Sequence, residues 1–252
     1  LTPTFFFTYL GFDWIQPLSP IQMNIVYWAM AFFSVLILIG YFYRVAISAF
    51  FLLFTYIELI DKTNYLNHYY FVSLVCFILI FLPAHRNYSL DAYFKRVEVV
   101  STVPNWTILI LQIQLAIVYF FAGISKMNAD WLLEALPMKI WLPAKANTPL
   151  IGWLFDYTWI AYMFSWFGML YDTSIPFFLW NKKTRFLAYV VVVVFHLATW
   201  ILFPIGVFPF VMIGTTLIFF SPQWAATILS KFKQTSTLNF YPKKRSLILF
   251  KV

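Results

Sequence analysis

Charged residues are scarce in this sequence. Only 10% of its 252 residues are charged, against roughly a quarter in soluble domains, whereas 63% are hydrophobic and 23% aromatic. This scarcity excludes an ordinary soluble domain and predicts an integral membrane protein. Strands of a transmembrane barrel alternate apolar and polar residues, and runs such as residues 190–195 do not alternate, so a barrel is excluded as well.

Cysteine, histidine and glycine are also rare. The single cysteine, Cys76, rules out an internal disulfide. Three histidines and no HExxH motif argue against zinc or haem, so we expect no metal; a set of His68, His196 and one carboxylate is the alternative. The seven glycines form no phosphate-binding loop. The net charge of +8 comes from residues between and after the apolar runs, which argues against nucleic acid as a partner.

Seven mostly apolar runs divide the sequence, each near the roughly 20 residues that a helix needs to cross a bilayer. They are residues 21–42, 45–60, 69–83, 106–125, 157–180, 186–203 and 205–220. Because hydrocarbon offers no partner for free backbone groups, we expect an all-α polytopic bundle with about seven transmembrane helices plus interfacial helices.

The domain organisation is expected to be simple. Residues 1–222 should form one transmembrane domain, and residues 223–252 a basic tail on the cytoplasmic side. The first residue is leucine, so we expect the sequence to be an excerpt of a longer protein.

The positions of the basic residues predict the topology. With seven crossings, the loops of one side carry four of the 17 lysines and arginines, namely Lys62, Lys126, Lys139 and Lys145. The positive-inside rule makes the other side cytoplasmic, including the tail. The polar residues 61–68, the Lys126 region and the turn at residues 204–206 then share the non-cytoplasmic side.

Lys126 stands where a long apolar run gives way to polar chain. Ala122 and Gly123 lie one turn back and should leave space beside the amine, and Tyr119 extends a polar stripe down the same face. One interpretation is a lysine that reaches from a helix end to the headgroups. The other is a desolvated, neutral amine that acts as a general base.

Other ionisable residues lie in or beside the apolar runs. His196 and Asp172 fall within runs, where such residues either serve function or complete an interhelical hydrogen bond. A carboxylate there needs a partner, and Lys126 or His196 could supply it. Residues 61–68 (DKTNYLNH) form either a solvated turn or part of a site.

Three of these segments resemble motifs of the vitamin K-dependent γ-glutamyl carboxylases. Residues 119–131 (YFFAGISKMNADW) look like the lysine motif of that family, and residues 61–70 (DKTNYLNHYY) resemble its Asp-Lys-Thr…Asn-His motif. Residues 195–212 (FHLATWILFPIGVFPFVM) are similar to its Phe-His…Phe-x-Ile-Gly-x-Phe segment. The sequence looks most like the bacterial members with an HTTM domain, which implies the bacterial inner membrane.

The resemblance implies a coupled reaction. A reduced vitamin K, a hydroquinone of the menaquinol or phylloquinol type, is deprotonated and oxidised by O2 to its epoxide. A strong base formed on the way removes a γ-proton from a protein glutamate, which then adds CO2. The implied partners are the lipid bilayer, a naphthoquinone and a glutamate-containing protein.

The resemblance also implies roles for individual residues. Lys126 would be the base on the hydroquinone, and His196 would line the same pocket. Asn67 and His68 would orient or stabilise the oxygenated quinone or the developing carboxylate. The supporting or quinone-binding positions would be Asp61, Lys62, Tyr65, Tyr119, Asp130, Trp131 and Asp172.

Three alternatives accompany this interpretation. The first is a quinone epoxidase or oxidoreductase without carboxylation. The second is a proton-coupled transporter using Asp172 and His196, which predicts broken helices in matching halves, whereas only residues 204–206 show such a break. The third is a non-catalytic scaffold, which predicts no enclosed pocket that holds both Lys126 and His68.

Overall fold

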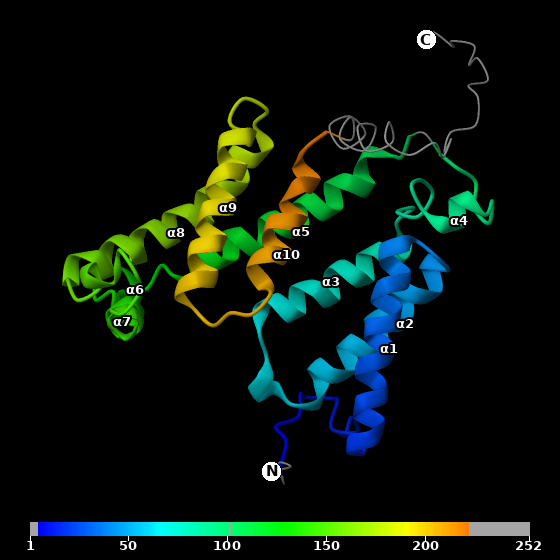
Figure 1. Cartoon of the computed structure of the whole chain (residues 1–252), viewed down its shortest axis with the longest axis horizontal. Coiled ribbons are helices and arrows are strands. Elements are labelled where there is room, and N and C mark those ends of the chain that lie inside the picture. Colours follow the sequence, from blue (N-terminus) through cyan, green and yellow to red (C-terminus); the bar gives the residue numbers. More distant parts are fainter. Residues whose placement is uncertain (1–4, 101, 222–252) are drawn as a thin grey trace.

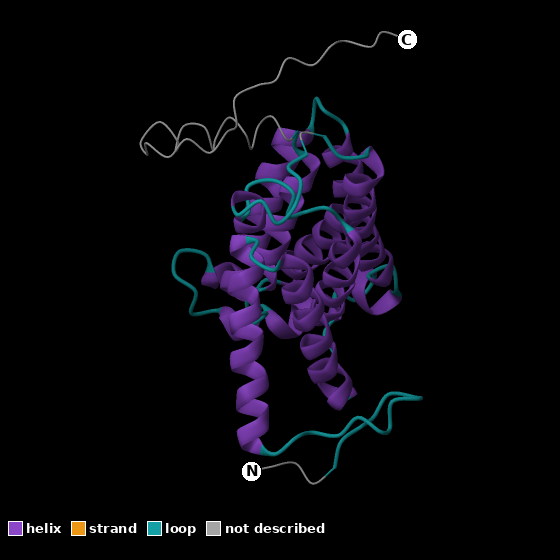
Figure 2. Ribbon diagram, turned by 90° about the vertical axis from the view of Figure 1, so that its right-hand side faces the viewer, coloured by secondary structure: helices purple, strands orange, loops and turns teal. Residues whose placement is uncertain are grey.

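The computed structural model describes residues 5–100 and 102–221, which fold as helices and connecting loops with no strand in these ranges (Figures 1 and 2). The α-helices are α1 Pro20–Ile39, α2 Tyr43–Ile60, α3 Asn67–Phe81, α4 Leu90–Tyr93, α5 Asn105–Ser125, α6 Ala129–Leu132, α7 Leu136–Trp141, α8 Thr158–Trp180, α9 Arg185–Leu202 and α10 Phe208–Thr216. Short 3₁₀ turns are Lys62–Asn64, Pro143–Lys145, Gly152–Leu154 and Leu217–Phe219. The predicted basic tail, residues 223–252, lies outside the described residues.

The expected count of seven membrane-crossing helices is not supported. Every one of the seven apolar runs forms a helix, but within the described residues only α1, α2, α5 and α9 are both long and apolar enough to cross a membrane. With 15 residues, α3 is about 22 Å long, short of the roughly 30 Å hydrocarbon core. The seventh run gives the nine-residue α10, and the 23-residue α8 is long enough but is not among the helices apolar enough to qualify.

The helices form two groups that lie side by side in Figure 1. In the first group, α2 packs between α1 and α3. In the second, α8 packs on α5, on α9 and on the short helices α6 and α7, while α10 packs on α9. Contacts of α3 with α5 join the two groups.

Helix ends in the first group are fixed by local and distant caps. Ser19 and Gln22 form a capping box at the start of α1, and Gly40, at φ +63°, ends that helix in the left-handed conformation. The two carboxylate oxygens of Asp91 accept hydrogen bonds from the backbone N–H groups of Phe42 and Tyr43, both at 2.9 Å. Asp91 therefore holds the loop that carries α4 against the start of α2.

Candidate functional site

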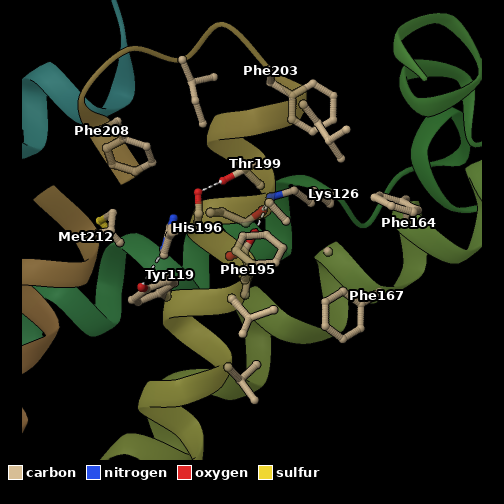
Figure 3. Close-up of a pocket in the computed structure, with 18 of the residues that line it drawn as sticks. Tyr119, Lys126, Phe164, Phe167, Phe195, His196, Thr199, Phe203, Phe208 and Met212 are labelled. Atoms are coloured by element: carbon tan, nitrogen blue, oxygen red, sulfur yellow. Dashed lines mark hydrogen bonds and ion pairs between the residues drawn. The ribbon is translucent and has the colours of Figure 1, made fainter. Parts of the chain in front are cut away.

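An apolar cavity of about 770 Å³ lies in the second helix group, between α5, α8, α9 and the start of α10 (Figure 3). Its volume falls within the roughly 300–1,000 Å³ of small-molecule sites. Valine, methionine and aromatic side chains make most of the wall. The polar side chains on the wall are Tyr119, Lys126, Asp172, His196 and Thr199, together with the indole of Trp131 and Trp141.

Lys126 and Asp172 form an ion pair on this wall. Lys126 follows the last residue of α5, Asp172 lies within α8, and the distance from Nζ to Oδ2 is 2.5 Å. The amine also donates to the carbonyl oxygen of Ala122 at 3.0 Å. Both side chains are largely buried, with 20% and 9% of their surfaces exposed. Of the two partners that the sequence allowed for Asp172, the structure shows Lys126.

The pairing depends on a close approach of α5 and α8 at Gly123. A Cβ atom on Gly123 would lie 2.3 Å from Oγ1 and 2.7 Å from the backbone nitrogen of Thr173. The prediction that Gly123 leaves space beside the Lys126 amine is therefore wrong, because Thr173 occupies that space. Ala122 does line the cavity.

Tyr119 and His196 form a second buried pair. The Tyr119 hydroxyl lies 3.0 Å from Nε2 of His196 and connects α5 to α9. Both residues line the cavity, as Figure 3 shows, and both are more than nine-tenths buried. The Tyr171 ring stacks on the neighbouring Phe195 with centroids 3.8 Å apart. These contacts hold the imidazole on the same wall as Lys126.

Trp131 ties the short helix α6 to α8 beside the ion pair. Its indole N–H donates to the carbonyl oxygen of Ser165 at 2.8 Å, and the Ser165 hydroxyl donates to the carbonyl oxygen of Trp131. The Lys126 amine lies 5.4 Å from the Trp131 ring, within cation–π range. Asp130, the preceding residue, is exposed and does not line the cavity.

The structure does not bring Asn67 and His68 into the cavity. Asn67 is exposed at the start of α3, and the His68 ring stacks on Phe208 with centroids 4.6 Å apart. Phe208 itself lines the cavity and lies 6.0 Å from the His196 ring. The phenyl ring of Phe208 therefore separates the two histidines, and the expectation of one pocket holding Lys126 and His68 is not met.

The rest of the 61–68 segment binds the N-terminal chain instead. Asp61 accepts hydrogen bonds from the backbone N–H groups of Thr63 at 3.0 Å and Phe7 at 3.3 Å. These bonds, that of Thr63 foremost, lower the pKa of the Asp61 carboxyl. The backbone N–H of Lys62 donates to the Phe7 carbonyl at 2.9 Å. The side chains of Lys62 and Tyr65 are exposed, outside the cavity.

Most residues of the apolar wall of the cavity were not predicted from the sequence. On α8 it includes Phe164 and Gly168, which lie eight and four residues before Asp172 and hence on the same helix face. That spacing was a signal that could have found them. Phe203 and Phe208, on either side of the turn at residues 204–206, carry no comparable pattern. In the described residues, no group of three or more His, Cys, Asp or Glu could hold a metal ion.

These features define an all-helical membrane protein with an apolar pocket that holds a buried ion pair. The chain belongs to the HTTM domain family, whose model matches residues 1–224. No solved structure matches the chain significantly.

Proposed function

We propose that the chain is a membrane-embedded enzyme like the vitamin K-dependent γ-glutamyl carboxylases. It would oxidise a reduced naphthoquinone to its epoxide with O2 and couple this oxidation to CO2 addition at a protein glutamate. The HTTM domain is associated with vitamin K-dependent carboxylase-like proteins, which supports the proposal. The observation that carries it is the apolar cavity with Lys126–Asp172 and Tyr119–His196 on one wall.

The residues of the cavity fit a naphthoquinone. A flat, apolar ring system needs aromatic and aliphatic walls, which Phe167, Phe195 and Phe208 supply with the valines of α9. Its two oxygens need polar partners, and Lys126 and His196 lie on the wall to provide them. When bound, a reduced naphthoquinone supplies an acidic phenol and the electrons for O2.

Lys126 is proposed to accept the phenolic proton of the quinol at its Nζ atom. As an ion pair, Lys126 and Asp172 carry no net charge, and shifting one proton from Nζ to Oδ2 gives a neutral amine and a neutral acid. The amine can then accept a phenolic proton, and the ammonium formed stabilises the anion left beside it.

His196 is proposed to orient the same ligand. Its Nε2 is engaged by the Tyr119 hydroxyl, which leaves Nδ1 as the nitrogen available to a ligand oxygen. The surrounding side chains leave almost none of the Tyr119 and His196 surfaces exposed. A dry site strengthens each of the electrostatic contacts.

A second candidate is quinone epoxidation without carboxylation. Its support is the position of Asn67 and His68, the groups implied for the oxygenated quinone or the developing carboxylate, which do not line the cavity. In this candidate their role is in neither step, and the oxidation of the quinone uses only residues that line the cavity.

The test is an assay of the protein in lipid vesicles with reduced vitamin K, labelled CO2 and a glutamyl peptide. We expect epoxide formation by the wild type and a loss of at least about 100-fold in Lys126→Ala, the usual scale for removing a general base. Lys182→Ala, which removes an exposed lysine after α8, is the matched control and should keep full activity.

The two candidates give different readouts in this assay. Label in the peptide together with epoxide supports the carboxylase, and epoxide without label supports the epoxidase. If the wild type turned over neither quinone nor peptide, or if Lys126→Ala matched the control, the proposal would be abandoned.

A further inference from the structure

The loop that carries α4 packs on the turn between α1 and α2 (Figure 1). The backbone N–H of Asp91 donates to the Gly40 carbonyl at 2.9 Å, and a Cβ atom on Gly40 would collide with the Ser89 side chain. Because α1 and α2 are both long and apolar enough to cross a membrane, the turn between them lies at a membrane boundary. The α4 loop is therefore held at the membrane surface.

Arg96, which follows α4, is held by two aromatic rings of this turn. Its guanidinium carbon lies 4.0 Å from the centroid of the Phe42 ring and 4.6 Å from that of Tyr41, and Nη2 donates to the Tyr41 hydroxyl at 3.2 Å. The backbone N–H of Arg96 donates to the Asp91 carbonyl at 2.8 Å. In the part of the chain that the structure describes, no carboxylate forms a salt bridge with Arg96. The guanidinium is thus fixed in position with its charge available to an anion.

The backbone is strained on both sides of this contact. Phe42 has φ +46° and Lys95 has φ +55°, in the left-handed region that residues with a Cβ atom rarely adopt. Such residues persist where the surrounding structure holds them, and they concentrate at functional sites and ligand clamps. The strain therefore lies where the exposed Lys95 and its neighbour Arg96 meet the turn.

Two more arginines lie near His85 of the same loop. Burial lowers the pKa of His85, and the charges of Arg44 and Arg86 lower it further against the opposing effect of Asp91. The carboxylate of Asp91 is buried and already accepts hydrogen bonds from the backbone of α2. With Glu98 as the exposed carboxylate of the loop, the basic side chains leave this surface with a positive net charge.

A phospholipid headgroup fits this surface better than a free anion. Tyr93 and Phe94 are each more than half exposed beside the basic residues, and the Phe94 ring lies 6.2 Å from that of Tyr41. Exposed aromatic rings at a membrane boundary suit the headgroup level of the bilayer. A zwitterionic lipid would bring a cation of its own toward Lys95 and Arg96, so an anionic headgroup is favoured.

We propose that Arg96 and Lys95 bind the phosphate of an anionic phospholipid at the membrane surface. The positive-inside rule assigns this surface to the cytoplasmic side, where anionic lipids create a negative surface potential. The site is independent of the proposed reaction, because neither these residues nor Tyr41 and Phe42 line the main cavity. A bound lipid would fasten the α4 loop to the bilayer.

The test titrates the intact protein in detergent with phosphatidylglycerol or with phosphatidylcholine of the same chain length, and native mass spectrometry measures the bound lipid. We expect the wild type to bind phosphatidylglycerol at least about fivefold more tightly. Arg96→Gln should lower that affinity about fivefold, the contribution of one basic residue at an anionic surface, and leave phosphatidylcholine unchanged. Lys182→Gln, which removes an exposed lysine after α8, is the matched control and should change neither affinity.

Two further variants separate this site from general surface charge. Arg96→Lys keeps the charge but removes the planar group that lies over Tyr41 and Phe42, so it should weaken phosphatidylglycerol binding as Arg96→Gln does. Lys95→Asn removes the neighbouring charge with a residue that tolerates φ +55°, and we expect a similar loss.

Three results would overturn the inference. They are equal binding of both lipids by the wild type, full phosphatidylglycerol binding by Arg96→Lys, and a loss in Lys182→Gln as large as that in Arg96→Gln. Displacement of phosphatidylglycerol by millimolar inorganic phosphate would also overturn it, because the occupant would then be a free anion rather than a lipid.

Discussion

Lys126 and Asp172 each carry a charge that would be costly alone in an apolar wall. Their 2.5 Å contact makes the pair neutral as a unit, and this neutrality lowers the cost of placing it in an apolar wall. Forming such a pair adds little to the free energy of unfolding. Removing one partner lowers it strongly, because the other charge is then left without compensation.

We therefore expect Asp172→Ala to destabilise the protein by about 3–5 kcal/mol, the usual cost of breaking a buried pair. The double variant Lys126→Ala with Asp172→Ala should recover part of that loss, because no charge is then left over. Thermal unfolding in detergent measures both. Strictly additive losses would mean that the two residues do not act as a pair.

At this scale the sequence identified the residues and offered Lys126 or His196 as the partner of Asp172, but it did not decide between the two. Lys126, Asp172 and His196 stand out because ionisable residues are expensive in apolar runs. Their contacts join positions 46 and 77 residues apart, which no local pattern encodes. His68 was expected in the same pocket, but it stacks on Phe208 of α10, which lines the pocket, and does not line it itself.

The central element of the site is the contact between α5 and α8. Gly123 allows the α5 backbone to lie directly against Thr173, and this approach brings Lys126 within reach of its carboxylate partner. Close packing of helices at small residues is the usual device of membrane bundles.

Gly123→Ala should separate these helices. The added methyl group would meet backbone and side chain of Thr173 within 3 Å, so we expect a destabilisation of about 1–3 kcal/mol and a loss of quinone turnover. Gly214→Ala on α10, where a Cβ meets nothing within 4 Å, is the matched control. Unfolding temperature and activity are measured for both, and equal behaviour of the two variants would contradict the role of Gly123.

The positions of the helices were largely predictable and their ends were not. The run at residues 45–60 became α2, Tyr43–Ile60, since long apolar segments in hydrocarbon have little alternative to a helix. The start of α2 is capped by Asp91, 48 residues or more away in sequence. The last run lost its first residues because the chain turns at Gly206, with φ +63°, before α10 begins.

Over the whole molecule, the number of crossings decides which helix ends share a side. The predicted sidedness assumed seven, and α8 is the long helix that does not reach the apolarity of the four clear spans. Whether α8 crosses determines whether the loops before and after it face opposite sides.

We predict that α8 crosses the membrane, so that the loops before and after it face opposite sides. Asn147→Cys, before α8, should react with a membrane-impermeant maleimide from the non-cytoplasmic side, and Lys183→Cys, after α8, from the cytoplasmic side; both positions are exposed. The only native cysteine, Cys76, is buried and gives a low background. Labelling of both positions from one side would rule out a crossing by α8.

The shortness of α3 and α10 has a consequence for the bilayer itself. These helices meet where His68 stacks on Phe208, at the edge of the cavity. A bilayer accommodates such short apolar segments by thinning locally, by snorkelling of flanking residues or by association of helices, each at a cost of fractions of a kcal/mol per Å. Local thinning at this edge would draw headgroups and water inward and, in the proposed carboxylation, would shorten the path of a polar peptide to the buried ion pair.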